Sequence, residues 1–168
     1  MQKATKIALI IFFLLIVAAI PLYYYTRPDT TQPDVYLQVK GKVTNPVNLT
    51  LTQLQTYTPV TLQVTLSSSS HTEDNGNFNY TGILLDDLLN QAQVQSDATS
   101  VFIQAADGYG MTLTIQEAQN QNTIIAYRKE GSPLSLLKDG GEGPLRLIIG
   151  DDEFAQRWVR GVASIEVS

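Results

Sequence analysis

The chain begins with one unbroken apolar run and continues with short segments in which apolar and polar residues alternate. Residues 7–20 (IALIIFFLLIVAAI) carry no charged or strongly polar side chain. Pro21 to Tyr25 extend this run to roughly the 20 residues that cross a bilayer. From residue 34 onward, the alternation is typical of half-buried strands. We therefore expect one transmembrane helix over residues 7–25 and a β-rich domain over residues 34–168.

Within this domain the pattern predicts many short strands and only brief helices. Strands are expected at residues 35–39, 60–64, 101–105, 111–115, 123–127, 145–149 and 162–167. Short helices are expected after Thr50 or Thr52, over residues 83–92, and near Glu117. Residues 67–79 are almost wholly polar and predict a long exposed loop. The expected class is α+β, mixed and dominated by β structure.

The charges that flank the apolar run indicate how it is oriented. Lys3 and Lys6 precede the run and Arg27 follows it, so the positive-inside bias places residues 1–6 in the cytoplasm. Residues 26–33 (TRPDTTQP) then form a linker, and the domain lies outside the cytoplasm at the cell membrane. A cleaved signal peptide is the alternative, although no clean small-x-small cleavage site follows the run. Both interpretations predict export.

Composition excludes several classes of chemistry. The chain has no cysteine, which rules out disulfides, thiolate metal sites and a cysteine nucleophile. Its formal net charge is -5, and nucleic-acid binding needs a basic patch. We therefore expect no nucleic-acid partner.

The order of short motifs from Gly41 to the C-terminus resembles the oxidoreductase molybdopterin-binding domain family, which has the fold of the sulfite oxidases. The motifs that carry this resemblance are Gly41-Lys42-Val43, Asn45-Pro46, Leu51 with Leu54, Tyr80-Thr81-Gly82 with Leu85 and Leu88-Leu89, Asp107-Gly108-Tyr109, Ala126-Tyr127, Gly131 with Pro133-Leu134, Gly143-Pro144-Leu145-Arg146, Trp158-Val159 and Ile165-Glu166-Val167. The resemblance implies a sulfite oxidase-like fold and a molybdopterin cofactor.

Two departures from the family pattern affect this cofactor. In the family, a cysteine after the strand that matches residues 60–66 binds the molybdenum, whereas this chain reads Ser67-Ser68-Ser69-Ser70-His71. A serine alkoxide forms far less readily than a thiolate and is not a soft ligand, so molybdenum is disfavoured. The family's pterin phosphate lies near the segment that matches residues 147–159, where this chain has three consecutive acids at 151–153. Arg157 and Arg160 can offset part of that charge, or serve as solvated flanks.

Individual residues leave further alternatives open. Arg146 interrupts an apolar strand, so its side chain points either to solvent or into a cleft where it needs an anionic partner. His71 titrates near neutrality, but a solvated loop histidine is the favoured interpretation because no second metal ligand stands near it at a regular spacing. Asp107 and Tyr109 either shape a pocket or form an ordinary turn. The candidate cofactor-binding residues are Ser67, His71, Asp107, Tyr109, Arg146, Arg157 and Arg160.

Two functions of different class follow. The favoured one is a non-catalytic module that binds a small-molecule ligand or a membrane protein partner outside the cytoplasm, because the metal-ligand cysteine is missing. The alternative is a molybdopterin-dependent oxidoreductase that passes electrons to a membrane partner. Fold alone does not decide between them.

Overall fold

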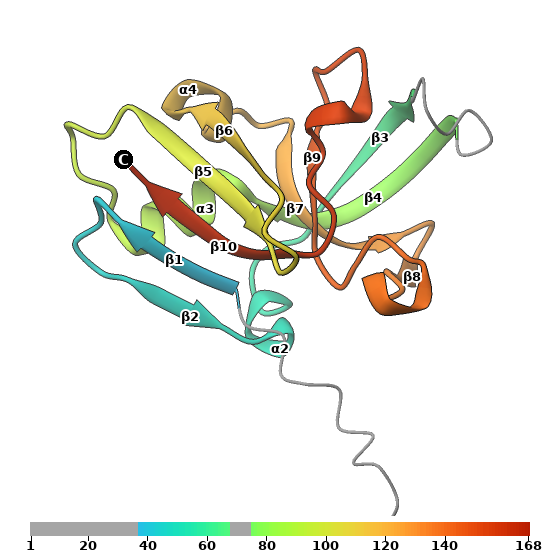
Figure 1. Ribbon diagram of the computed structural model, residues 1–168, viewed down its shortest axis with the longest axis horizontal. Helices are drawn as coiled ribbons and strands as arrows, with labels where there is room; N and C mark the ends of the chain where they lie inside the picture. Colours follow the sequence, from blue (N-terminus) through green and yellow to red (C-terminus); the bar gives the residue numbers. More distant parts are fainter. Residues whose placement is uncertain (1–36, 68–74) are drawn as a thin grey trace, which may run out of the picture. The chain divides into compact units, whose positions relative to one another are not determined.

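The computed structural model describes residues 37–67 and 75–168, which form two β-sheets with short helices (Figure 1). The strands are β1 (Leu37–Gly41), β2 (Val47–Leu49), β3 (Val60–Leu66), β4 (Gly76–Leu84), β5 (Ser100–Ala105), β6 (Gly110–Thr114), β7 (Thr123–Lys129), β8 (Ser132–Pro133), β9 (Arg146–Ile149) and β10 (Val162–Val167). The helices are α2 (Leu51–Leu54), α3 (Leu85–Ala92), α4 (Ile115–Ala118) and the 3-10 turns η2 (Leu137–Asp139) and η3 (Ala155–Arg157). The predicted β-dominated α+β class is confirmed.

The first sheet has the strand order β2-β1-β10-β5-β6. β1 runs parallel to β10, and the other neighbours are antiparallel. Gly41 ends β1 at φ +93°, and a Cβ there would lie 2.1 Å from the carbonyl oxygen of Val167. Glycine is therefore required where β1 leaves its parallel partner.

The second sheet has the strand order β3-β4-β7-β8, and β9 also pairs with β7. β4 is the long central strand: its first part pairs with β3 and its last part with β7. A register shift between Thr81 and Gly82 marks the point where the pairing with β7 changes.

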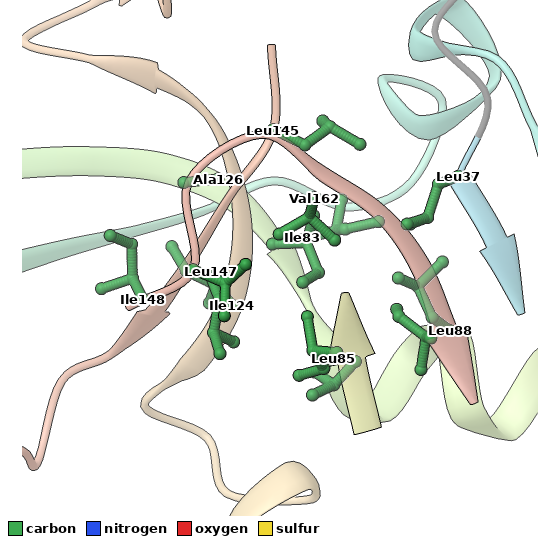
Figure 2. Packing of buried hydrophobic residues seen from close by; sticks show 14 of the residues in the cluster. Leu37, Ile83, Leu85, Leu88, Ile124, Ala126, Leu145, Leu147, Ile148 and Val162 are labelled. Carbon is green, nitrogen blue, oxygen red and sulfur yellow. The ribbon is translucent and has the colours of Figure 1, made fainter. Parts of the chain in front are cut away.

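One hydrophobic core joins the two sheets. Helix α3 contacts β1, β4 and β7, and it buries Leu85, Leu88, Leu89 and Ala92. Figure 2 shows Leu85 and Leu88 together with Leu37 and Val162 of the first sheet and Ile83, Ile124 and Leu147 of the second. Removing this much apolar surface from water is the main force that holds the sheets together.

Short polar motifs cap the N-termini of two helices. Thr50 and Thr114 each accept a hydrogen bond from the backbone of the residue three positions later, whose side chain bonds back. These capping boxes satisfy the free N–H groups at the start of α2 and α4. The prediction of a helix after Thr50 or Thr52 is thus confirmed with Thr50 as the cap.

Two predicted boundaries were wrong. The helix expected over residues 83–92 begins only at Leu85, because Ile83 and Leu84 pair with Ile125 and Ile124 of β7. The loop expected over residues 67–79 ends earlier, since β4 begins at Gly76. Its polar residues still form a strand because β3 supplies a ladder partner for each of them.

Several predictions concern segments beyond the described residues. The predicted membrane helix over 7–25, its cytoplasmic and linker flanks, and His71 all lie outside 37–67 and 75–168. Within those two ranges, no helix is long and apolar enough to cross a membrane.

Candidate functional site

Arg146 occupies the first position of β9, a strand whose four residues are all buried. The side chain is only 1% exposed, so it needs compensating partners. Its Nη1 donates to the Tyr80 hydroxyl at 2.8 Å and forms an ion pair with the Glu142 carboxylate. The rings of Tyr80 and Trp158 lie 5.5 and 5.4 Å from the guanidinium carbon. Of the two orientations left open by the sequence, the structure selects the inward one.

A second cation shares the Glu142 carboxylate. Lys129 Nζ lies 3.1 Å from Glu142 Oε1 and 3.9 Å from the centre of the Phe78 ring. An open pocket of about 260 Å³ adjoins this pair and is also lined by Pro133, Leu134 and Ser135. The pocket thus presents the Lys129 ammonium and the Glu142 carboxylate beside Pro133 and Leu134.

The charge state of this cluster follows from its burial. Burial raises the pKa of Glu142, but the Arg146 charge and the hydrogen bonds from Arg146, Lys129 and Tyr80 outweigh burial and leave the pKa below its usual value. Burial also raises the pKa of the Tyr80 hydroxyl, more than the Arg146 charge lowers it. At neutral pH Glu142 is therefore ionised, and Tyr80 keeps its proton and donates it to Glu142 at 2.9 Å.

Arg157 forms a second charged cluster at the end of η3. Its guanidinium donates to Asp152 through Nε at 3.0 Å, and to Glu117 through Nη1 at 2.7 Å. The hydrogen bonds that Arg157 donates to Asp152 first, and then to Glu117, raise the pKa of Arg157 above its usual value. One of the acids expected to repel a phosphate is thus neutralised by the arginine expected to attract it.

The turn η3 gathers three of the predicted site residues. Ser67, which follows β3, accepts a backbone hydrogen bond from Ala155 at 3.0 Å. The Tyr109 hydroxyl donates to the carbonyl of Gln156 at 3.2 Å, and Arg157 closes the turn. Ser67, Tyr109 and Arg157 therefore meet around one turn, although they are 42 or more residues apart in sequence, counted from 67 to 109 and 109 to 157.

The remaining predicted residues have other positions. Asp107 lies in the exposed turn before β6, where its Oδ1 accepts the Tyr109 backbone N–H at 3.0 Å. Its role in the structure is that of a turn residue. Arg160 pairs with Arg146 in an isolated antiparallel bridge, and its half-buried side chain has a charge that lowers the pKa of Tyr80. Trp158 is buried, as expected, and donates to the Ile149 carbonyl at 3.1 Å.

Sequence reasoning missed the partners that make Arg146 tolerable in the core. Glu142 stands four residues before it in a glycine-rich loop, and Tyr80 and Lys129 come from β4 and β7. An acid four residues from an arginine was a weak signal, because the loop between them has no periodic pattern. Across the part of the chain that the structure describes, no three histidine, aspartate or glutamate side chains are grouped to hold a metal.

Comparisons with known proteins identify a family and a solved structure that this chain resembles. A family model described as the oxidoreductase molybdopterin binding domain matches residues 25–168. Among solved structures, the sulfane dehydrogenase SoxCD from Paracoccus pantotrophus superposes with a TM-score of 0.68 at 18% identity, over 83% of this chain and 39% of that chain. The chain thus spans about two fifths of the length of that protein chain. No curated protein sequence matches. The predicted sulfite oxidase-like fold is confirmed.

Proposed function

Because the chain belongs to the oxidoreductase molybdopterin-binding domain family, we propose that it is a membrane-anchored, extracytoplasmic form of this domain that binds a ligand or partner without catalysing metal-dependent chemistry. One observation carries this proposal: the family model matches residues 25–168, but the chain contains no thiol. The chain therefore lacks the molybdenum ligand that the family resemblance implies.

The residues present do not fit a thiolate-bound, phosphate-bearing cofactor. Ser67 follows β3, where the family resemblance places the loop with the cysteine, and its backbone carbonyl accepts a hydrogen bond from η3. The charge of Arg157 is already satisfied by Asp152 and Glu117, and that of Arg146 by Glu142. An arginine whose charge is already offset in this way attracts a phosphate less strongly than an unpaired arginine does. We derive no redox step from this site.

These residues support the binding of a ligand in the pocket beside Lys129 and Glu142 better than they support the binding of a molybdenum cofactor. The two side chains are about three-quarters or more buried, and the three charges of the Lys129–Glu142–Arg146 cluster hold one another in place. A preformed pair of this kind loses little side-chain freedom when a small polar ligand binds.

Metal and pterin analysis tests the proposal. The full chain is expressed in a host that makes molybdopterin and is purified in detergent. Molybdenum is measured by mass spectrometry and pterin by the fluorescence of its oxidised form. We expect both far below one per chain. A family member that keeps its cysteine, purified in parallel, should carry both. One molybdenum or one pterin per chain would instead support the oxidoreductase alternative and overturn the non-catalytic proposal.

A further inference from the structure

Among the residues that the structure describes, strand β3 lies at the end of the second sheet (Figure 1), and no strand pairs with its other backbone edge. Over Val60–Leu66 it pairs with β4 in an unbroken antiparallel register. Among the described residues, no backbone hydrogen bond joins these seven positions to any element other than β4. Of the strands that end a sheet path, β3 is the longest: β2 has three residues, β6 five and β8 two. An open edge of this length is a template for another strand.

The usual features that block such an edge are absent from β3. Edge strands of soluble proteins are protected by lysines, prolines, bulges or inward-pointing charges. The sequence of β3, VTLQVTL, contains no charge, proline or glycine, and its register with β4 has no bulge. No Asp, Glu, Lys or Arg stands anywhere between Lys42 and Glu73. The chain as a whole has a net charge of -5, so an uncharged edge is where two copies approach with least repulsion.

We propose that β3 pairs antiparallel with β3 of a second copy of this chain, around a two-fold axis that passes through Gln63. In this register Thr61 lies opposite Thr65 of the second copy, Leu62 opposite Val64, and Val60 opposite Leu66. Each polar residue therefore meets a polar one and each apolar residue an apolar one, and Gln63 meets Gln63. Threonine and β-branched pairs of this kind stabilise antiparallel sheets.

The two faces of β3 support this pairing. Thr61, Gln63 and Thr65 are exposed. The Thr61 side chain hydrogen-bonds to Thr81 of β4, and the Thr65 side chain to Asn77 of β4. The second copy extends this polar row across the axis. On the other face, Val64 and Leu66 are buried and Val60 and Leu62 only half-buried, so the pairing removes further apolar surface from water. The contact is isologous, because each copy contributes the same strand, so the assembly stops at a dimer.

Because the chain has no cysteine, single-cysteine crosslinking tests the register directly. Residues directly opposite in an antiparallel pair have Cα atoms about 4.5–5.5 Å apart, which a disulfide spans. Gln63→Cys in the full chain, purified in detergent and mildly oxidised, should give a crosslinked dimer. Thr61→Cys is the matched control on the same exposed face, since the two copies of residue 61 lie about 13 Å apart along the strands. It should stay uncrosslinked.

Sedimentation of the same detergent-purified chain provides a second measurement. The unmodified chain should form a dimer. Gln63→Lys should weaken the dimer by about tenfold or more, because two like charges face each other at the axis. Thr112→Lys, at an exposed position of edge strand β6, should leave dimerisation unchanged. Equal crosslinking of both cysteine variants would overturn the register. A monomer at every concentration would overturn the dimer and leave the edge to a different protein, without bearing on the metal analysis above.

Discussion

At the scale of single residues, Arg146 is the side chain with the most demanding environment. It is fully buried, yet its charge is balanced by Glu142, and its guanidinium lies near the aromatic rings of Tyr80 and Trp158. Its Nε is a buried nitrogen without a hydrogen-bond partner among the described residues. Arg157 makes similar ion pairs at a site where its side chain is 34% exposed. Comparing the two arginines therefore shows how burial changes the contribution of an ion pair to stability.

Removing each arginine charge should have unequal effects on stability. Arg146→Met leaves the partly buried Glu142 with Lys129 as its one charged partner among the described residues, and we expect a loss of about 3 kcal/mol in the free energy of unfolding. Arg157→Met removes a partly solvated pair and should cost about 1 kcal/mol. Urea unfolding followed by circular dichroism measures both. Equal losses would mean that the Arg146 network contributes no more than a surface pair.

Glu142 gives a pH dependence of stability. Its pKa is lowered in the folded state, so its contribution is present above the pKa of an unfolded glutamate, about 4.3. The contribution is lost as pH falls through the lower, folded-state pKa. Glu142→Gln should therefore be less stable than the unmodified chain at pH 7. This difference in stability should become smaller below about pH 4. Thermal unfolding at several pH values measures it.

Glu153→Gln, at an exposed position, controls for the loss of one negative charge. It should show no such narrowing. A Glu142→Gln gap that stays constant with pH would contradict the assignment of Glu142 as the ionised partner of Arg146.

At the scale of elements, the antiparallel pairing of β4 with β7 decides how the second sheet is built. At Tyr80–Gly82 strand β4 pairs with β3 on one edge and β7 on the other, and the register with β7 shifts between Thr81 and Gly82. A Cβ at Gly82 would lie 2.2 Å from the carbonyl oxygen of Ile125 and 2.5 Å from the Cα of Ala126. These are backbone atoms, which cannot rotate away as a side chain can.

Gly82→Ala should therefore destabilise the domain by about 1–3 kcal/mol. Gly76→Ala, on the same strand, is the matched control because a Cβ there meets only the Phe78 ring, at 3.1 Å. Its effect should be within about 0.5 kcal/mol. Chemical denaturation compares the two, and equal effects would show that the two strands separate easily at Gly82.

Local patterns were sufficient for most elements but not for all of their ends. The hairpin of β5 and β6 and the final strand β10 follow from alternation and turn residues alone. The start of α3 did not, because Ile83 and Leu84 fit the apolar face of a helix as well as the end of a strand. Their pairing with β7, some 40 residues away, decided between the two.

At the scale of the whole molecule, we propose that the N-terminal apolar segment determines where the domain works. We predict that residues 7–25 stay attached and hold the chain in the membrane, since no clean cleavage site follows them. The purified protein should then have the intact mass of the full chain, 18.5 kDa, and should stay in the membrane after alkaline carbonate extraction. A soluble, shorter chain that begins near Pro21 would mean that the segment is a cleaved signal peptide.

Such an anchor would also favour the β3 pairing. Confining two domains to one membrane raises their effective concentration, so a modest edge contact is enough to bring them together. The membrane anchor and the dimer are tested separately. The crosslinking uses detergent-purified chains, which are no longer confined to one membrane.

The sequence by itself determined the strand-rich class, the short helices after Thr50 or Thr52 and near Glu117, and the lack of any thiol chemistry. These depend on residues within a few positions of one another, or on composition alone. Only the tertiary structure decided which way Arg146 points, because its partner Tyr80 lies 66 residues away and the alternation in β9 fits either face. It also decided that Ser67, Tyr109 and Arg157 meet at η3. Contacts across such distances depend on how the two sheets pack, which no local pattern encodes.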